Sequence, residues 1–208
     1  MFDMEHGSKS RGGRPWSFDR EQAVETAMRL FWRHGYEGVS VGDLTKAIGI
    51  APPSLYAAFG SKAGLYQEAL ARYEGSVGLL DFAAVAQADD LPQAVRLLLE
   101  RAIEAVIHPD RERGCMISSG MVTCHPDHVA LARDLAARRE DIRMRIVQAL
   151  RPFGDNETIP GLARHLAAVM QGISIQARDG SSRAELQEIV EDVVAGFDRR
   201  QSRGQASR

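Results

Sequence analysis

Residues 40–62 read S-V-G-D-L-T-K-A-I-G-I-A-P-P-S-L-Y-A-A-F-G-S-K, and this stretch decides the fold. Ser40 is a good helix N-cap, and Asp43 stands three residues later, where a carboxylate closes a capping box. The apolar residues that follow keep helical spacing. Gly49 ends this helix, because glycine takes the left-handed C-cap conformation without steric cost. The Pro-Pro pair at 52–53 then begins a second helix, in whose first turn the missing N–H groups cost nothing.

Two short helices joined by a tight turn have the geometry of a helix-turn-helix, whose second helix enters a DNA major groove. A helix over 18–34 carries an apolar stripe that is expected to pack on the helices over 41–48 and 52–59. A further helix over 62–77 completes this small core. We therefore predict a DNA-binding domain over residues 17–77, with the helix-turn-helix at 40–59.

The remainder of the chain keeps helical periodicity and shows no convincing strand-like alternation. Helices are expected over 91–108, 114–123, 126–150, 159–178 and 182–197, the last of them with a capping box formed by Ser182 and Glu185. The predicted fold is all-α, with an N-terminal three-helix helix-turn-helix domain and a larger C-terminal helical domain over 78–200. Residues 1–16 are expected to form a flexible basic arm, and residues 201–208 a disordered tail.

Basic residues cluster locally although the formal net charge of the chain is −2. Lys9, Arg11, Arg14 and Arg20 lie close together ahead of the helix-turn-helix. Arg11 and Arg14 are candidates for phosphate or minor-groove contacts, and a solvated tail is the alternative. No apolar run reaches the ~20 residues of a membrane helix, and no signal peptide is recognisable, so a cytoplasmic location is expected.

The two cysteines, Cys115 and Cys124, are too few for a disulfide-stapled scaffold. With His108, His125 and His128 they suggest a metal site, but their spacing matches no standard zinc motif. If 115–124 formed one helix, the two Cα atoms would lie ~13 Å apart, beyond the ~7 Å limit of a disulfide. No catalytic motif stands out, so no enzyme activity, metal or cofactor is predicted. A metal or redox sensor remains a minor alternative.

Three segments carry a family resemblance: F-W-R-H-G-Y-E-G at 31–38, S-V-G-D-L at 40–44, and S-L-Y-A-A-F-G-S-K at 54–62, with the glycine turn between the last two. Over residues 17–77 the chain resembles the DNA-binding domain of TetR/AcrR-type transcriptional regulators. From residue 91 onward it is similar only in its pattern of helices. The resemblance implies a homodimer that binds a palindromic double-stranded DNA operator and releases it when a small-molecule effector binds in the C-terminal domain.

The resemblance also implies which residues contact DNA. They lie at the start of the second helix, along the third helix and at the start of the fourth: Ser40, Val41, Thr45, Ala51, Pro52, Pro53, Ser54, Tyr56, Ala57 and Lys62. Alanine stands at position 51, where a capping Ser or Thr is frequent in the family, and the third helix has few long polar side chains. Because short side chains make no bidentate base contacts, backbone contacts and DNA shape would carry more of the specificity.

The C-terminal helices supply the candidates for ligand binding and dimerisation. Flexible methionines suit an adaptable apolar pocket, although they suit ordinary core packing equally well. The pocket candidates are Phe82, Leu98, Met116, Ser118, Ser119, Thr123, His125, Met144, Met170, Gln171 and Ile175. The last two helices are expected to form a four-helix dimer interface through Leu162, Leu166, Met170, Ile173, Leu186, Ile189, Val193 and Phe197.

We therefore interpret the sequence as that of a ligand-responsive transcriptional repressor. Its sparsely polar third helix leaves open a small-molecule sensor or carrier that does not engage DNA.

Overall fold

The computed structural model describes residues 18–76 and 82–206, and this part of the chain is helical and contains no strand. The α-helices are α1 (Arg20–His34), α2 (Val41–Ile48), α3 (Pro52–Phe59), α4 (Lys62–Ser76), α5 (Leu91–Val106), α6 (Met116–Ser119), α7 (Val129–Leu150), α8 (Ile159–Asp179) and α9 (Arg183–Ala206). Short 3-10 turns are η1 (Val85–Gln87), η2 (Pro126–His128) and η3 (Arg151–Phe153). The prediction of an all-α fold is confirmed.

The helix-turn-helix forms through the local signals in its sequence. The Ser40 hydroxyl accepts the Asp43 N–H at 3.0 Å, and the Asp43 carboxylate accepts the Ser40 N–H at 2.9 Å, which completes the capping box of α2. Gly49 caps the other end of α2 with φ +79°, a conformation that favours glycine. The α1 helix begins two residues later than predicted, because the Asp19 side chain caps it by accepting the N–H groups of Glu21 and Gln22.

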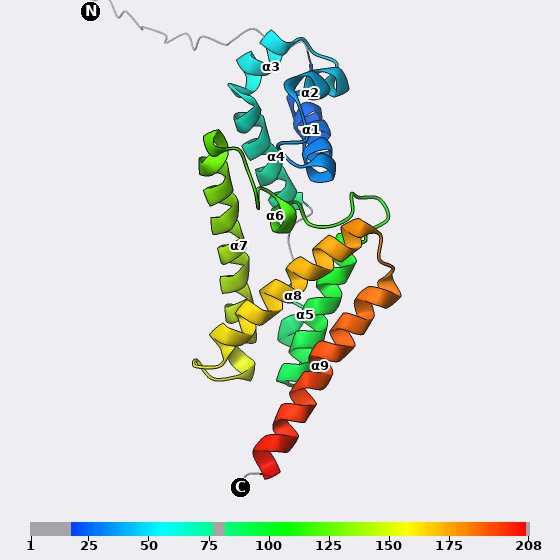
Figure 1. Cartoon of the computed structure of the whole chain (residues 1–208), viewed down its shortest axis with the longest axis vertical. Helices are drawn as coiled ribbons and strands as arrows, with labels where there is room; N and C mark the ends of the chain where they lie inside the picture. The colour runs from blue at the N-terminus through cyan, green and yellow to red at the C-terminus, as the bar shows by residue number, and fades with distance from the viewer. Residues whose placement is uncertain (1–17, 77–81, 207–208) are drawn as a thin grey trace, which may run out of the picture.

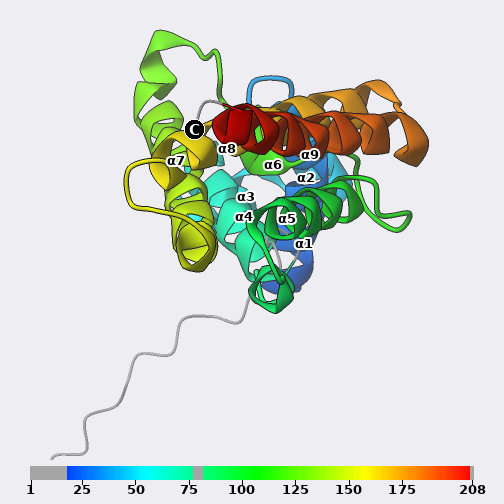
Figure 2. The same ribbon diagram turned by 90° about the horizontal axis from the view of Figure 1, so that it is seen from below.

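Helices α1–α4 gather at one end of the molecule and α5, α8 and α9 at the other, while α7 runs along one side (Figure 1). The short α6 lies between the two groups. Seen from below, α8 and α9 lie side by side along one face, with α5 beneath them in the picture (Figure 2). The helix-turn-helix is therefore presented at the far end from α9.

The buried apolar residues of the described chain form two clusters, and the border between them does not follow the sequence. The first unites α1–α4 with Met116, Ile117 and Met121 around α6 and with Leu131 and Leu135 of α7. The second joins α5 and the later half of α7 to α8 and α9. Segments that follow the helix-turn-helix by more than fifty residues thus complete its core.

Some predicted helix bounds were wrong. In place of a helix over 114–123, α6 has a single turn, since the chain leaves the helix at Gly120 and Met121 has φ +51°. α5 ends at Val106 rather than at residue 108, because the residue before Pro109 disfavours helical geometry. Residues 126–128 form η2 ahead of α7. The last helix continues to Ala206, so residues 201–206 are helical rather than a disordered tail.

Candidate nucleic-acid interface and internal cavity

The outer side of α3 is exposed, while its inner side is anchored in the core. Leu55 is fully buried and Phe59 is 6% exposed, whereas Tyr56 is 49% exposed. The remaining surface of α3 is formed by small or rigid side chains, which let a partner approach the backbone closely. The exposed candidates at this face are Ala51, Pro52, Pro53 and Ala57, with Ser54 half-buried.

The three candidates on α2 differ in their accessibility. Ser40 is exposed and Val41 half-buried, but Thr45 is only 7% exposed. The Thr45 hydroxyl donates to the carbonyls of Val41 and Gly42 at 3.0 and 3.1 Å. Thr45 therefore points into the protein and bonds to its own helix, so the expectation that it faces DNA does not fit the structure. It lies directly after buried Leu44 and shares its inward face.

Lys62 begins α4 and lies against an aromatic ring. Its Nζ is 4.1 Å from the centroid of Tyr36, and burial lowers the pKa of this lysine. The Ser61 hydroxyl accepts the Gly64 N–H at 3.0 Å and caps the helix. The positive end of α4 and the ammonium group thus lie together next to α3, an arrangement that suits a phosphate. Arg11 and Arg14 lie outside the described residues.

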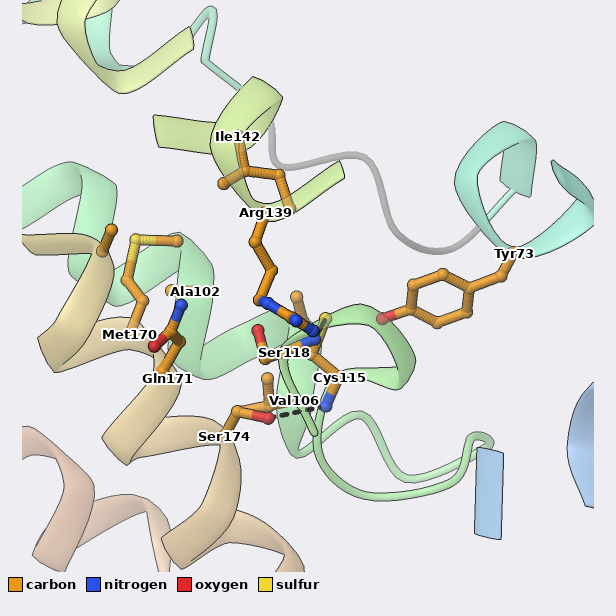
Figure 3. Close-up of a pocket in the computed structure, with 12 residues that line it drawn as sticks. Tyr73, Ala102, Val106, Cys115, Ser118, Arg139, Ile142, Met170, Gln171 and Ser174 are labelled. Carbon is orange, nitrogen blue, oxygen red and sulfur yellow. Dashed lines mark hydrogen bonds between the residues drawn. The ribbon is translucent and has the colours of Figure 1, made fainter. Parts of the chain in front are cut away.

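An internal cavity of about 50 Å³ opens among α4, α5, α6, α7 and α8. Figure 3 shows residues from all of these elements around it. Of the predicted pocket residues, Met170, Gln171 and Ser118 line the cavity. The sequence interpretation missed several lining residues: Tyr73, Ala102, Ala105, Val106, Cys115, Arg139, Ile142, Ala167 and Ser174.

The polar groups of the cavity are tied to the backbone that surrounds it. The Ser174 hydroxyl accepts the Cys115 N–H at 2.8 Å, which links α8 to the start of α6. Nη1 of Arg139 donates to the carbonyls of Ile117 and Gly120 at 3.0 and 2.9 Å. Burial, and then the neighbouring Cys115 thiol, raise the pKa of Tyr73 well above its usual value.

The remaining pocket candidates lie elsewhere. Thr123 and His125 are exposed on the loop before η2, and Met144 and Ile175 are 42% and 43% exposed on their helices. The last candidates belong to packed parts of the protein: Leu98 lies in the second core cluster, Phe82 packs against that cluster, Met116 lies in the first cluster, and Ser119 bonds to the Cys115 carbonyl.

Several polar contacts among the described residues join the helix-turn-helix end to the rest of the molecule. Trp32 Nε1 donates to the Gly114 carbonyl at 3.0 Å. Arg178 of α8 donates to the carbonyls of Trp32 and Arg33, at the C-terminal end of α1, at 2.7 and 3.1 Å. The Glu37 carboxylate accepts the His125 N–H at 3.0 Å and lies 2.7 Å from His128 Nδ1. The hydrogen bond from the His125 N–H and then that with His128 hold the pKa of Glu37 below its usual value.

The predicted dimer residues divide into two sets. Leu166, Ile173 and Leu186 are fully buried within the subunit, so they are unavailable to a partner and that part of the expectation was wrong. Met170 lines the internal cavity. The other set surrounds a surface hollow between α8 and α9: Leu162, Ile189, Val193 and Phe197, together with His165, Asp192 and Gly196.

Cys115 and Cys124 are both free, half-buried thiols. Because α6 is one turn long, the segment between them is not a continuous helix, and the distance argument against a disulfide does not apply as stated. Within residues 18–76 and 82–206, no group of three His, Cys, Asp or Glu side chains is arranged to hold a metal ion. In the same residues, no helix is long and apolar enough to cross a bilayer.

An exposed helix-turn-helix above a larger helical body that encloses a cavity defines the class: a DNA-binding transcriptional regulator. Residues 23–69 match the family described as bacterial regulatory proteins, tetR family. The transcriptional repressor ComR of Escherichia coli (strain K12) is 35% identical over 193 residues, covering 87% of this chain and 89% of ComR. The repressor BdcR of the same strain is 34% identical over 178 residues, covering 84% of this chain and 86% of BdcR.

A solved structure agrees with these relatives. The TetR family transcriptional regulator CifR, as a cysteine mutant complexed with 26-bp double-strand operator DNA, is 35% identical to this chain with a TM-score of 0.81. The match covers 88% of this chain and 98% of the CifR chain. The protein belongs to the TetR family.

Proposed function

We propose that the protein is a cytoplasmic transcriptional repressor that binds a palindromic operator as a homodimer and is released from it by a small molecule. The exposed outer face of α3, beside the N-terminus of α4, is the observation that carries the proposal. The similarity of the whole chain to the transcriptional repressors ComR and BdcR, and to CifR complexed with operator DNA, supports repression through operator binding.

The composition of α3 suggests how such an operator would be bound. Tyr56 and Lys62 would contact phosphates, together with the N–H groups at the start of α4. Ser54 offers a hydroxyl to a base edge, while the prolines and Ala57 offer apolar contact to thymine methyl groups. Because these side chains are short, the site would hold the backbone firmly and derive much of its specificity from DNA shape.

The hollow between α8 and α9 is the proposed dimer interface. It is rimmed by half-buried apolar residues, including Ile189, Val193 and Phe197. Two copies packed here would form a four-helix interface related by a two-fold axis. Such an axis places two α3 helices on successive major grooves, one or more turns of ~34–36 Å apart, which requires a palindromic site.

The proposed function is tested by fluorescence anisotropy with DNA from upstream of the protein's own gene, using ligand-free protein whose dimeric state is verified by sedimentation. We expect saturable binding that Tyr56→Ala weakens about tenfold or more, since the hydroxyl and the ring both leave the interface. Val122→Ala removes an exposed apolar side chain from the loop that follows α6 and should leave affinity unchanged. If dimeric wild-type protein binds this DNA no better than an unrelated duplex, the repressor proposal fails for this operator, and failure across a library of random duplexes refutes it.

A further inference from the structure

The cavity contains an unpaired positive charge. Of the described residues that line it, Arg139 alone carries a formal charge at neutral pH. Arg139 makes no ion pair with any described residue, whereas the preceding Arg138 pairs with both Glu74 and Asp134. A partly buried charge without a counter-charge is costly, so this arrangement favours an anionic ligand.

The hydrogen bonds of Arg139 leave part of the guanidinium free. Nη1 donates to the Ile117 and Gly120 carbonyls, which are neutral acceptors and leave the charge uncompensated. Nε and Nη2 make no hydrogen bond with the described residues. Figure 3 shows the guanidinium among the lining side chains, beside Ser118 and Cys115. A carboxylate at this point could accept two parallel hydrogen bonds from the fork of N–H donors that a guanidinium presents.

The rest of the lining suits an apolar ligand body. Ala102, Val106, Ile142 and Met170 contribute apolar side chains to the lining, and Gln171 and Ser118 are neutral. The free volume of the cavity, about 50 Å³, is that of a few water molecules, so a larger ligand would enter as the surrounding side chains move apart. The lining therefore favours an amphipathic ligand with one charged head over a fully hydrophilic anion.

The approach to the cavity is also basic. A second hollow between α7 and α8 shares Arg139, Ala167 and Gln171 with the cavity. It is lined further by Arg143 and Arg164. Glu140 lies in the same hollow and pairs with Arg143, which leaves a net positive approach. Such a field raises the local concentration of anions.

We propose that the cavity binds a small amphipathic monocarboxylate, with the carboxylate on Arg139 and the apolar part against α5, α7 and α8. This identifies the effector class of the proposed repressor, and its regulatory consequence rests on that proposed function. The carboxylate would bind Nε and Nη2, while Nη1 of the same guanidinium holds the carbonyls of Ile117 and Gly120, so ligand binding is coupled to the position of α6.

A displacement of α6 would be transmitted to the DNA-binding end through close packing. A Cβ placed at Gly120 would lie 2.5 Å from the Leu135 side chain and 3.2 Å from the Tyr66 hydroxyl of α4, so Gly120 is packed closely against both side chains. Ile117 lies in the same core cluster as α1–α4. A shift of α6 therefore displaces α4 and changes the spacing of the two α3 helices in the dimer.

The test uses full-length, DNA-free protein and isothermal titration calorimetry. The probes are benzoate and hexanoate, their neutral counterparts benzamide and hexanamide, and inorganic phosphate as a hydrophilic anion. We expect at least one carboxylate to bind at least about tenfold more tightly than its amide and than phosphate, since a charged hydrogen bond is lost in each amide. Arg139→Gln should weaken carboxylate binding about tenfold or more, and Arg139→Lys should weaken it less.

Arg133→Gln, which removes an exposed charge from the same helix, is the matched control and should bind the carboxylates like the wild type. The inference is overturned if amides or phosphate bind as tightly as the carboxylates, if Arg139→Gln binds like the wild type, or if no carboxylate binds. The comparison of carboxylate with amide uses wild-type protein and does not depend on the variants folding. Operator binding without carboxylate binding overturns this inference alone, whereas carboxylate binding without DNA binding overturns only the proposed function.

Discussion

Replacing Arg178 by methionine tests the connection between the two ends of the molecule. The guanidinium reaches from α8 to the C-terminal end of α1, where helix carbonyls lack partners and the helix dipole is negative. Each hydrogen bond from a charged donor contributes ~1.5–3 kcal/mol. The bond to Trp32 is part-buried at 2.7 Å, and that to Arg33 is exposed at 3.1 Å, so the second contributes less. We expect Arg178→Met to lower the free energy of unfolding by about 2–3 kcal/mol.

Urea denaturation followed by both tryptophan fluorescence and circular dichroism measures this loss. Trp32, one of the two tryptophans of the chain, lies in the first core cluster, so its part of the fluorescence signal reports on α1, while circular dichroism reports on the whole helical content. The two transitions should coincide in the wild type and separate in the variant. Arg33→Met is the control, because it removes the exposed pair with Glu112 and should cost less. A change within about 0.5 kcal/mol of wild type, or no larger than that of the control, would refute the reasoning.

Three further predictions concern pH, salt and assembly. Glu37→Gln should lower the free energy of unfolding at neutral pH. Because the His125 N–H and His128 depress the pKa of Glu37, the extra stability of the wild type is present above the ordinary pKa of 4.5 and is lost as the pH falls below it. Thermal denaturation at several pH values measures this difference. Lys62→Gln should weaken DNA binding on every sequence and reduce the slope of log affinity against log salt by about one, measured by anisotropy at graded salt. Phe197→Asp should shift sedimentation from dimer to monomer, because it places a charge in the proposed apolar interface.

Local signals in the sequence were sufficient for the helix-turn-helix. Its capping box, glycine turn and proline start act within a few residues, so they predicted the bounds of α2 and α3. The orientation of Thr45 was harder to predict from the sequence, because in a helix of this length Thr45 lies near the border between the inner and outer faces. Its hydroxyl donates to carbonyls of its own helix, and the side chain faces inward.

The cavity and the proposed dimer face depend on packing between residues that are far apart in the sequence. The helical periodicity of apolar residues describes this packing only in part. Arg139 keeps the spacing of the stripe formed by Leu135, Ile142 and Ile146, and this register was the available signal for an inward charge. Charged residues are usually assigned to the outer face, so it was overlooked. In α8, Leu162 and Leu166 both belong to the apolar stripe, yet only Leu166 is fully buried within the subunit.

The position of α6 changes how an effector would act in this molecule. A sequence boundary after α4 suggests that the DNA-binding end is a separate unit, reached through a linker. In the structure, Met116, Ile117 and Met121 are part of its core, and they lie directly beside the cavity residues Cys115 and Ser118. A ligand in the cavity would therefore disturb the packing of the DNA-binding end itself. Because packed cores shift between discrete arrangements rather than deform continuously, a small displacement at α6 would alter the separation of the two α3 helices in the proposed dimer.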